Sequence, residues 1–400
     1  MLAAILALTF SYNIALAAIV LVVPLYLHAQ GVSSVVLGLA ASVPPLVGLI
    51  LRLPSGVLSD RVGERTVLIG ATLTMGAAAG ALLLAPKTGE TATGLIVLAL
   101  LLSGVSRAVY WPCAQSYASR AAKGDFARVS GLFTSTGHFG QIIGTPICGY
   151  LLATWGFGAG FGLIVGGSIL GLIISVQLRR PQADKTAVRD GAAKASPFAG
   201  LGASLLELAR SRKMLFSGLC LAGAAVATAL AGSFYPVYLA DLGMRADSIG
   251  WLSSCRAFAA MVSSFGLGIL GARLTTPSAW LIGAGMVGVG VGITPLLGSF
   301  GGLAIAMALI GASGGILQVL GMDVAARGSG THNRAKAMAF TGLFFSVSLW
   351  AIPLALGVIA QAAGLRAGFA ILGVLWLVLA AAVFGPARRM FTAGPTPDQS

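Results

Sequence analysis

The chain has 400 residues, of which 57% are hydrophobic and only 9% are charged, and its formal net charge is +14. An ordinary soluble domain has about 25% charged residues, so this composition excludes one. The positive charge does not predict nucleic-acid binding, because the basic residues lie in short segments between apolar runs and not on one aromatic-rich face. The composition therefore predicts a membrane protein that binds no nucleic acid.

Twelve apolar runs follow one another along the chain, each long enough as a helix to cross the roughly 30 Å of a bilayer core. Helices are expected because unpaired backbone groups are too costly in lipid, and the runs lack the alternation of a barrel strand. The prediction is an all-α polytopic membrane protein with 12 transmembrane helices. The expected spans are residues 4–28, 34–58, 66–85, 93–118, 128–153, 157–178, 214–239, 248–270, 278–298, 301–325, 335–361 and 366–385.

The basic residues predict the orientation of these spans. Most of the 25 Lys and Arg residues fall in the loops on the same side as the N-terminus, while Lys87, Arg245 and Arg366 fall on the other side. Cytoplasmic loops carry an excess of Lys and Arg. Both termini are therefore expected in the cytoplasm, with the protein in the inner (cytoplasmic) membrane and in contact with its lipids.

The longest polar segment divides the spans six and six. The expected parts are an N-terminal six-helix bundle (1–178), a cytoplasmic linker (179–213), a C-terminal six-helix bundle (214–387) and a short cytoplasmic tail (388–400). Leucines on one face of residues 201–213 fit an amphipathic helix on the membrane surface, and a plain tether fits equally well.

The two halves resemble each other at nearly constant offsets. An offset of 212 relates Pro24-Leu25-Tyr26-Leu27 to Pro236-Val237-Tyr238-Leu239, Gly31 to Gly243, Gly38 to Gly250 and Gly56 to Gly268, and an offset of 208 relates Gly156–Phe161 to Gly364–Phe369. Such repeats place a solute site between two pseudo-symmetric bundles, near the middle of the membrane, and expose it to each side in turn.

A charged pattern lies between the second and third spans: Gly56-x-Leu58-x-Asp60-Arg61-x-Gly63-x-Arg65. It resembles the signature loop of the major facilitator superfamily. With the twelve helices, the central linker and the repeat, the resemblance covers essentially the whole chain. It implies a transporter whose bundles rock against each other, with Gly56, Asp60, Arg61, Gly63 and Arg65 forming a gating motif. The chain departs from the pattern at Glu64, where a basic residue is commoner.

The resemblance gives Asp60 a specific role. The second-half copy of the pattern, Gly268–Arg273, lacks the acid. In the family, this carboxylate faces the positive N-terminal end of the eleventh helix, which here begins near His332. Such a contact contributes roughly 0.3–2 kcal/mol. Our hypothesis is that Asp60 and Arg61 latch the cytoplasmic side closed and do not bind solute.

Further patterns resemble the 12-helix drug:proton antiporters of this superfamily, and they imply proton-coupled efflux of a small organic solute. Pro24 matches a proline late in the first helix, and Arg107 matches an Arg in the fourth, although Tyr110 and Trp111 depart from the expected residues. The fifth helix carries the expected glycines and proline with one residue, Thr145, inserted. This helix-packing and hinge set is Gly140, Gly144, Pro146 and Gly149.

Polar residues inside the spans are the candidates for the solute and ion path, because ionisable groups are expensive at bilayer depth. Arg107 either binds an anionic group, tunes a proton site, or pairs with backbone carbonyls or polar neighbours. Thr134, His138, Gln141 and Thr145 share one helical face, and His138 either titrates near neutral pH or is satisfied by a neighbouring helix. The remaining candidates are Asn13, Tyr235, Arg256, Gln318 and Trp350.

No acidic residue falls at the middle of a span. The embedded arginines therefore favour a neutral or anionic solute over a cationic one. Uptake or exchange of an organic anion or nutrient is the alternative to efflux, and a non-transporting membrane sensor is the alternative of another class. Scattered histidines and cysteines predict no enzyme, no metal site and no cofactor. We expect a monomer whose partners are a small-molecule solute and protons.

Overall fold

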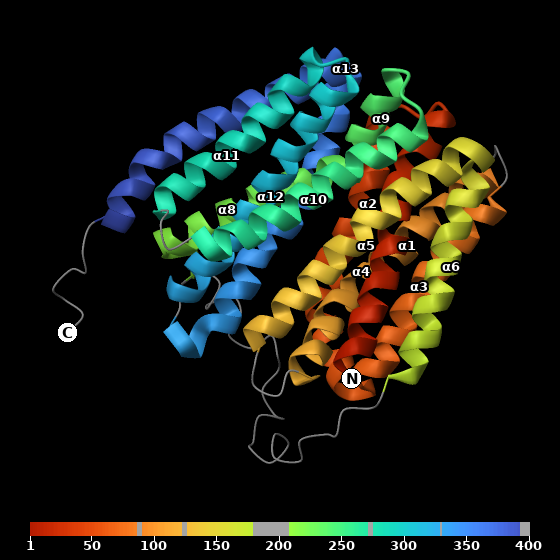
Figure 1. Ribbon diagram of the computed structural model, residues 1–400, viewed down its shortest axis with the longest axis horizontal. Helices are drawn as coiled ribbons and strands as arrows, with labels where there is room; N and C mark the ends of the chain where they lie inside the picture. Colours follow the sequence, from red (N-terminus) through yellow and green to blue (C-terminus); the bar gives the residue numbers. More distant parts are fainter. Residues whose placement is uncertain (86–89, 122–125, 179–207, 271–274, 329, 393–400) are drawn as a thin grey trace.

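The computed structural model describes residues 1–400 apart from 86–89, 122–125, 179–207, 271–274, 329 and 393–400. Its described residues form helices and no strand, which confirms the all-α prediction (Figure 1). The amphipathic helix proposed for residues 201–213 lies partly outside these residues, because 201–207 are not described. The helices of the first half are α1 (Leu2–Ala29), α2 (Ser34–Val62), α3 (Glu64–Leu84), α4 (Glu90–Ala121), α5 (Phe126–Trp155) and α6 (Phe157–Gln177).

The second half repeats this arrangement with two interruptions. Its helices are α8 (Arg212–Ala231), α9 (Phe234–Asp241), α10 (Ala246–Leu270), α11 (Thr276–Ile293), the short 3-10 helix η2 (Thr294–Leu296), α12 (Phe300–Gly328) and α13 (Gly330–Thr392). Within α13, Gly364 has non-helical φ 83° and ψ 160° and separates the last two predicted spans. In the described residues, nine helices are long and apolar enough to cross a membrane, and α13 counts once among them. The helices α5 and α10 cover predicted spans without being among the nine.

The seventh predicted span, 214–239, is not one continuous helix. It breaks between α8 and α9 at Gly232 and Ser233. Glycine lowers helix stability at this point, and the Ser233 hydroxyl donates to the carbonyl of Ala229 at 2.6 Å. The break was missed because the hydrophobic run continues through it.

The predicted charged loop between the second and third spans is shorter than expected. The helix α2 continues to Val62 and α3 begins at Glu64, so the connection is Gly63 alone, with φ 86°. A positive φ is strained for residues other than glycine. Asp60 and Arg61 therefore belong to the last turn of α2, which places them on a helix and not in a loop.

The helices form two groups, α1–α6 and α8–α13, which occupy different sides of the molecule in Figure 1. Four tight turns mark one end, which we call the distal end. Each contains a left-handed glycine: Gly31 (φ 71°), Gly156 (77°), Gly243 (77°) and Gly364 (83°). These four positions are related by the repeat offsets, so equivalent turns of the two halves share a backbone conformation.

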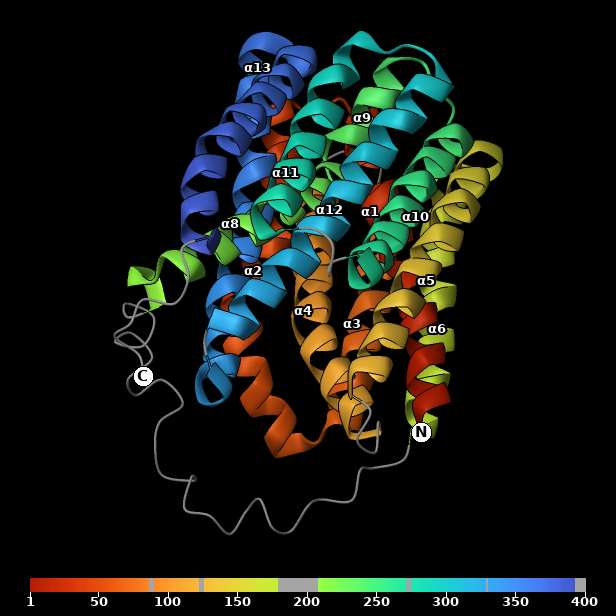
Figure 2. The ribbon, with the colours of Figure 1, turned by 60° about the vertical axis from the view of Figure 1, so that its left-hand side comes forward.

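The two groups meet along two helix pairs. The helix α2 packs against α13, and α5 packs against α10; Figure 2 shows α10 running alongside α5. The pairs are exchanged by the repeat, because α2 corresponds to α10 and α5 to the first part of α13. Of these four helices, α2 and α13 line the candidate site, together with α1, α4 and α8.

Candidate solute cavity and its gate

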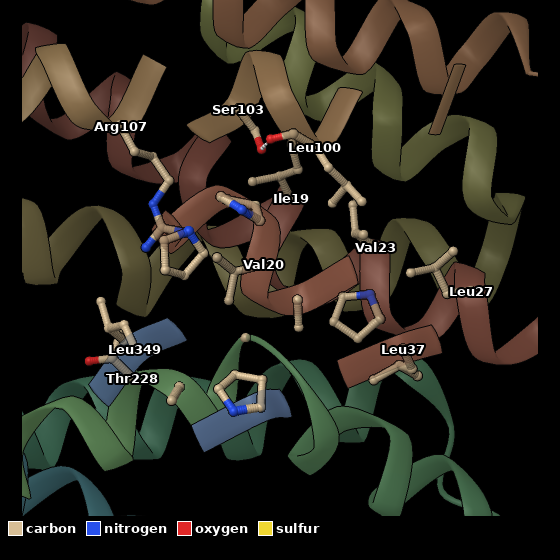
Figure 3. A pocket seen from close by; sticks show the side chains of 17 residues that line it. Ile19, Val20, Val23, Leu27, Leu37, Leu100, Ser103, Arg107, Thr228 and Leu349 are labelled. Atoms are coloured by element: carbon tan, nitrogen blue, oxygen red, sulfur yellow. Dashed lines mark hydrogen bonds between the residues drawn. The ribbon is translucent and has the colours of Figure 1, made fainter. Parts of the chain in front are cut away.

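A cavity lies between the two groups, bounded by α1, α2 and α4 on one side and by α8 and α13 on the other. Its walls are mainly aliphatic side chains and prolines, and the polar side chains among the described residues that line it are Ser103, Arg107 and Thr228 (Figure 3). Its volume of about 70 Å³ is well below the roughly 300–1,000 Å³ of drug-sized ligand sites. In this conformation the cavity therefore admits only a small solute or part of a larger one.

Arg107 is the charged group of this cavity. It lies near the middle of α4, roughly 25 Å along the helix from Glu90 at about 1.5 Å per residue. Figure 3 shows its guanidinium directed into the cavity, with Leu27 and Leu37 at the opposite end. Among the described residues, its side chain makes no hydrogen bond and no ion pair, and the Tyr12 hydroxyl interacts with it electrostatically.

Glycines bring the two groups into close contact on the distal side of the cavity. A Cβ added at Gly38 of α2 would lie 2.5 Å from the carbonyl oxygen of Pro353 in α13, and 3.2 Å from the Cα of Gly357. At the equivalent place, a Cβ added at Gly250 of α10 would lie 2.5 Å from the carbonyl oxygen of Thr145 in α5. Its distance from the Cα of Gly149 would also be 3.2 Å. We call these two contacts the paired gate.

Serine hydroxyls reinforce both halves of the paired gate. The Ser42 hydroxyl of α2 lies 2.8 Å from the carbonyl of Trp350 and 2.8 Å from that of Gly38 in its own helix, so its one hydrogen is shared between them. Ser254 of α10 donates to the carbonyl of Ile142 at 2.7 Å. Pro146 lacks the N–H that would otherwise bind the Ile142 carbonyl within α5. Ser254 therefore satisfies a backbone group of the opposite bundle that its own helix leaves free.

Leu37 separates the cavity from a second hollow at the distal end. Its side chain is buried and lines both spaces. In the second hollow, Nε2 of His28 in α1 lies 3.1 Å from Oδ1 of Asp241 in α9. This contact is a third link between the two groups, and it lies nearer the distal surface than the cavity does.

The polar face predicted on the fifth helix is divided by the structure. Thr134 is exposed, whereas Thr145 is buried and donates to the Gln141 carbonyl within α5. The Gln141 amide donates to Oδ1 of Asn13 at 3.3 Å, and the Asn13 amide donates to the Thr9 carbonyl. None of these four side chains lines the cavity, and the Gln141–Asn13 hydrogen bond joins α5 to α1 within the first half.

Besides Arg107, two basic side chains lie between α5 and α10: His138 of α5 and Arg256 of α10. Nδ1 of His138 and Nε of Arg256 are buried without a hydrogen-bond partner, and the Arg256 charge acts on the imidazole. A further candidate, Tyr235, packs within the second half. Tyr235 is fully buried, with its hydroxyl 3.5 Å from that of Thr294 and its ring against Phe369.

The remaining candidates of the second half differ in their contribution. Trp350 offers its carbonyl to the paired gate. Gln318 is partly exposed on α12 and does not line the cavity.

The glycines of the predicted hinge set in α5 lie at close helix contacts. A Cβ at Gly140 would lie 2.7 Å from the Phe10 carbonyl oxygen, and one at Gly144 would lie 3.0 Å from the Cα of Ile14.

The predicted gating motif is described in part. Gly56, Asp60 and Arg61 lie in α2, and their side chains, like those around His332, are outside the described residues. Arg65 donates to the Val176 carbonyl at the end of α6. Glu64, where the chain departs from the family pattern, is buried, with its carboxylate 3.4 Å from Nε of Arg120. This part of the motif joins α3 to α4 and α6.

Sequence reasoning missed Thr228, the pair His28–Asp241 and both gate serines. One signal was present for the serines, because Ser42 and Ser254 are separated by the same 212 residues as Gly38 and Gly250. The other residues carry no comparable signal, since their role depends on which helices the fold places together.

Comparisons with known proteins agree with this architecture. The chain matches the Major Facilitator Superfamily over residues 3–239 and 218–399. It is similar to a solved mutant of the nucleoside transporter NupG (TM-score 0.78, 12% identity, covering 98% of this chain and 100% of that one). It is also similar to a POT family transporter in complex with a thioalcohol-conjugated peptide (0.75, 14%, 96% and 96%). A peptide transporter POT mutant in complex with sulfate is similar too (0.74, 17%, 98% and 94%).

No curated protein matches the sequence. At these identities the solved structures show a common fold, while the family match extends from residue 3 to residue 399. The chain therefore belongs to the Major Facilitator Superfamily, an integral membrane family of transporters and not of enzymes.

Proposed function

We propose that this protein is a secondary transporter that carries a small organic solute through the cavity between its bundles by alternating access. One observation supports this most directly: the cavity has walls from both bundles, and the contacts at its distal side are two equivalent copies of one arrangement. Separation of these contacts, with closure at the opposite end, exposes such a cavity to the other side of the membrane. From the basic loops, we place the distal end outside and both termini in the cytoplasm.

The direction that we propose is proton-coupled efflux. The likeness of Pro24, Arg107 and the glycines of α5 to drug:proton antiporters supports it. Among the candidate residues of the solute and ion path, His138 is the side chain type that gains and loses a proton near neutral pH. Its Nδ1 has no hydrogen-bond partner among the described residues, so this nitrogen is not already engaged, and His138 is our candidate for the proton carrier.

Uptake or exchange of an organic anion is the second candidate. The observation that favours it is Arg107, a cation in the cavity with no carboxylate beside it. Efflux and uptake differ in the polarity of the proton gradient that drives them, so one experiment separates them.

The test uses purified protein in liposomes, with the membrane potential held at zero and three permanently ionised or uncharged probes. They are naphthalene-2-sulfonate, naphthalene-2-sulfonamide and the 2-naphthyltrimethylammonium cation. Antiport with protons predicts accumulation of a probe when the lumen is acidic. Symport predicts accumulation when the outside is acidic, and exchange predicts counterflow without a gradient. A chain that moves none of the probes in any of the three formats contradicts the proposed function.

A reversible lock provides the control for alternating access. In a background without native cysteines, His28→Cys and Asp241→Cys place thiols on α1 and α9, where the native side chains are 3.1 Å apart. We expect a short, reducible bis-methanethiosulfonate linker to stop flux, and a reductant to restore it. Each single-cysteine variant, treated in the same way, should keep its flux. Undiminished flux through the cross-linked protein would contradict the rocking mechanism.

A further inference from the structure

The positions of the acidic residues determine whether the charge of Arg107 is neutralised within the protein. All eleven acidic residues lie within five residues of a helix end or outside the helices that the structure describes. Two of them lie inside a helix near its end. Asp323 already forms an ion pair with Arg327 within α12, and Asp60 is two residues from the end of α2. Among the residues that the structure describes, no carboxylate is therefore placed to neutralise Arg107 near the middle of α4.

An unpaired guanidinium in apolar surroundings is costly, because the charge loses water without gaining a partner. A ligand that supplies a negative charge recovers this cost, whereas a cation adds repulsion. A planar guanidinium also matches the oxygens of a carboxylate or sulfonate in a two-point hydrogen bond. Arg107 is a single such group in this cavity, and the other lining side chains carry no charge, so it balances one negative charge and not two.

A second group for the ligand comes from the opposite bundle. Thr228 of α8 lines the cavity, and its hydroxyl has no hydrogen-bond partner among the described residues, so it is free to donate (Figure 3). Ser103, in contrast, already donates to the Leu100 carbonyl at 2.8 Å and cannot donate the same hydrogen to an anion. Arg107 and Thr228 therefore offer donors from two bundles to one anionic group.

The rest of the cavity selects the remainder of the solute. From Arg107 it extends past Val20 and Val23 to Leu27 and Leu37, as Figure 3 shows. Two prolines of α2 and one of α13 complete this wall. Such a surface gains free energy by covering apolar groups and offers nothing to a second polar group.

From this geometry we infer that the solute is an amphipathic organic monoanion. Its carboxylate or sulfonate binds Arg107 and Thr228, and its apolar body points toward Leu27 and Leu37. This inference rests on the transport function proposed above and names the class of solute for the same cavity. It excludes organic cations, dianions and fully polar solutes as good ligands.

Binding of the three naphthalene probes to the full-length protein in detergent tests the inference through thermal stabilisation, because a ligand of the folded state raises its stability. We expect the sulfonate to bind about tenfold or more tightly than the sulfonamide, since a hydrogen bond to a charged group is worth at least this factor. The cation should give no stabilisation. Naphthalene-2,6-disulfonate should bind more weakly than the monosulfonate.

Substitutions in the cavity test whether Arg107 and Thr228 cause the tighter binding of the sulfonate. Arg107→Gln should remove the advantage of the sulfonate over the sulfonamide, while Arg107→Lys should keep part of it. Thr228→Val, which preserves side-chain shape, should weaken sulfonate binding by about two- to tenfold. Arg366→Gln is the control, because Arg366 is exposed and does not line the cavity. If Arg107→Gln does not fold, Arg107→Lys and Thr228→Val decide the question.

The outcomes separate this inference from the proposed function. Tighter binding of the cation, or sulfonate binding that none of the cavity variants changes, would overturn the monoanion inference even if the protein transports another probe. Sulfonate binding that depends on Arg107 and Thr228 without any flux would support the site and contradict transport.

Discussion

Two serine hydroxyls carry side-chain hydrogen bonds across the paired gate, and Ser254 offers the sharper case. It donates to the Ile142 carbonyl, which Pro146 leaves without a partner inside α5. A buried carbonyl that loses its donor costs about 1–3 kcal/mol. The contact exists only while α5 and α10 are packed together. Loss of the Ser254 hydroxyl therefore destabilises the conformation in which the distal gate is closed.

We therefore expect Ser254→Ala to open the distal side more often. The reporter is a cysteine at Leu37 in a background without native cysteines, because Leu37 is 2% exposed and separates the two hollows. Its labelling by an impermeant maleimide from the distal side should become about five- to a hundredfold faster, in line with the cost above.

The neighbouring serine supplies a matched control. Ser253 is equally buried but donates to the Ile249 carbonyl of its own helix. Ser253→Ala should leave the labelling rate within about twofold of the parent, since it removes no contact between bundles. Equal acceleration by both variants would mean that α10 has loosened generally, and it would remove Ser254 from the gate.

For single residues, the sequence predicted which side chains are polar or charged inside the membrane better than it predicted which residues they contact. Arg107 was recognised as a cation at bilayer depth, and it lies in the cavity. Asn13 and Gln141 were recognised as polar residues inside spans, yet they bind each other and do not line the cavity. Periodicity gives the face of a helix, but the identity of the helix opposite depends on the packing of the whole molecule.

At the scale of elements, the paired gate depends on how closely α2 approaches α13 and how closely α10 approaches α5. At Gly38 and Gly250, an added methyl group would meet a backbone carbonyl at 2.5 Å. A backbone atom in a helix cannot move aside alone, so the two helices must separate. Overpacking of this kind typically costs about 1–3 kcal/mol.

Gly38→Ala and Gly250→Ala should therefore each accelerate distal labelling of the Leu37→Cys reporter. The effect of the two should be similar, because the contacts are equivalent. Gly48→Ala in α2 and Gly266→Ala in α10 are matched controls, as neither added methyl group has an atom within 4 Å. These controls should stabilise their helices by up to about 1 kcal/mol without changing access. Unchanged labelling in both gate variants would argue against a closed distal gate.

The ends of helices were predicted where a hydrophobic run gives way to polar residues, and they were missed where the hydrophobic run continues. The tight turn at Gly63 follows from a left-handed glycine between two helices, but the flanking charges suggested a longer loop. The break at Gly232 and Ser233 lies inside a hydrophobic run, so hydropathy alone could not locate it. In contrast, the repeat offset paired Gly38 with Gly250 correctly, because equivalent contacts conserve their spacing between the two halves.

At the scale of the whole molecule, rocking requires a contact that holds the other end closed when the distal gate opens. The proposed latch is Asp60, at the last turn of α2, acting on the start of α13 near His332. An aspartate near a helix N-terminus contributes roughly 0.3–2 kcal/mol. Loss of its charge should therefore favour the conformation with the distal gate closed.

We expect Asp60→Asn to slow distal labelling of the Leu37→Cys reporter by about two- to thirtyfold, the range that this energy allows. The sign is opposite to that of the gate variants, so Asp60→Asn combined with Gly250→Ala should return the rate toward the parent value. An Asp60→Asn protein with unchanged labelling and unchanged transport would rule out the latch. This double variant also tests whether the two ends of the molecule share one equilibrium.

The pairing of the gate has a consequence for the orientation of the cargo. The gate is built from equivalent halves, whereas the cavity cation is not: Arg107 belongs to the first bundle, and its place in the second is taken by uncharged residues of α12. A solute that binds this cation has a fixed head and tail relative to the bundles, although the surrounding scaffold is nearly symmetric. Its two ends therefore leave the protein in a set order, and mirror-image solutes present different faces to the same walls.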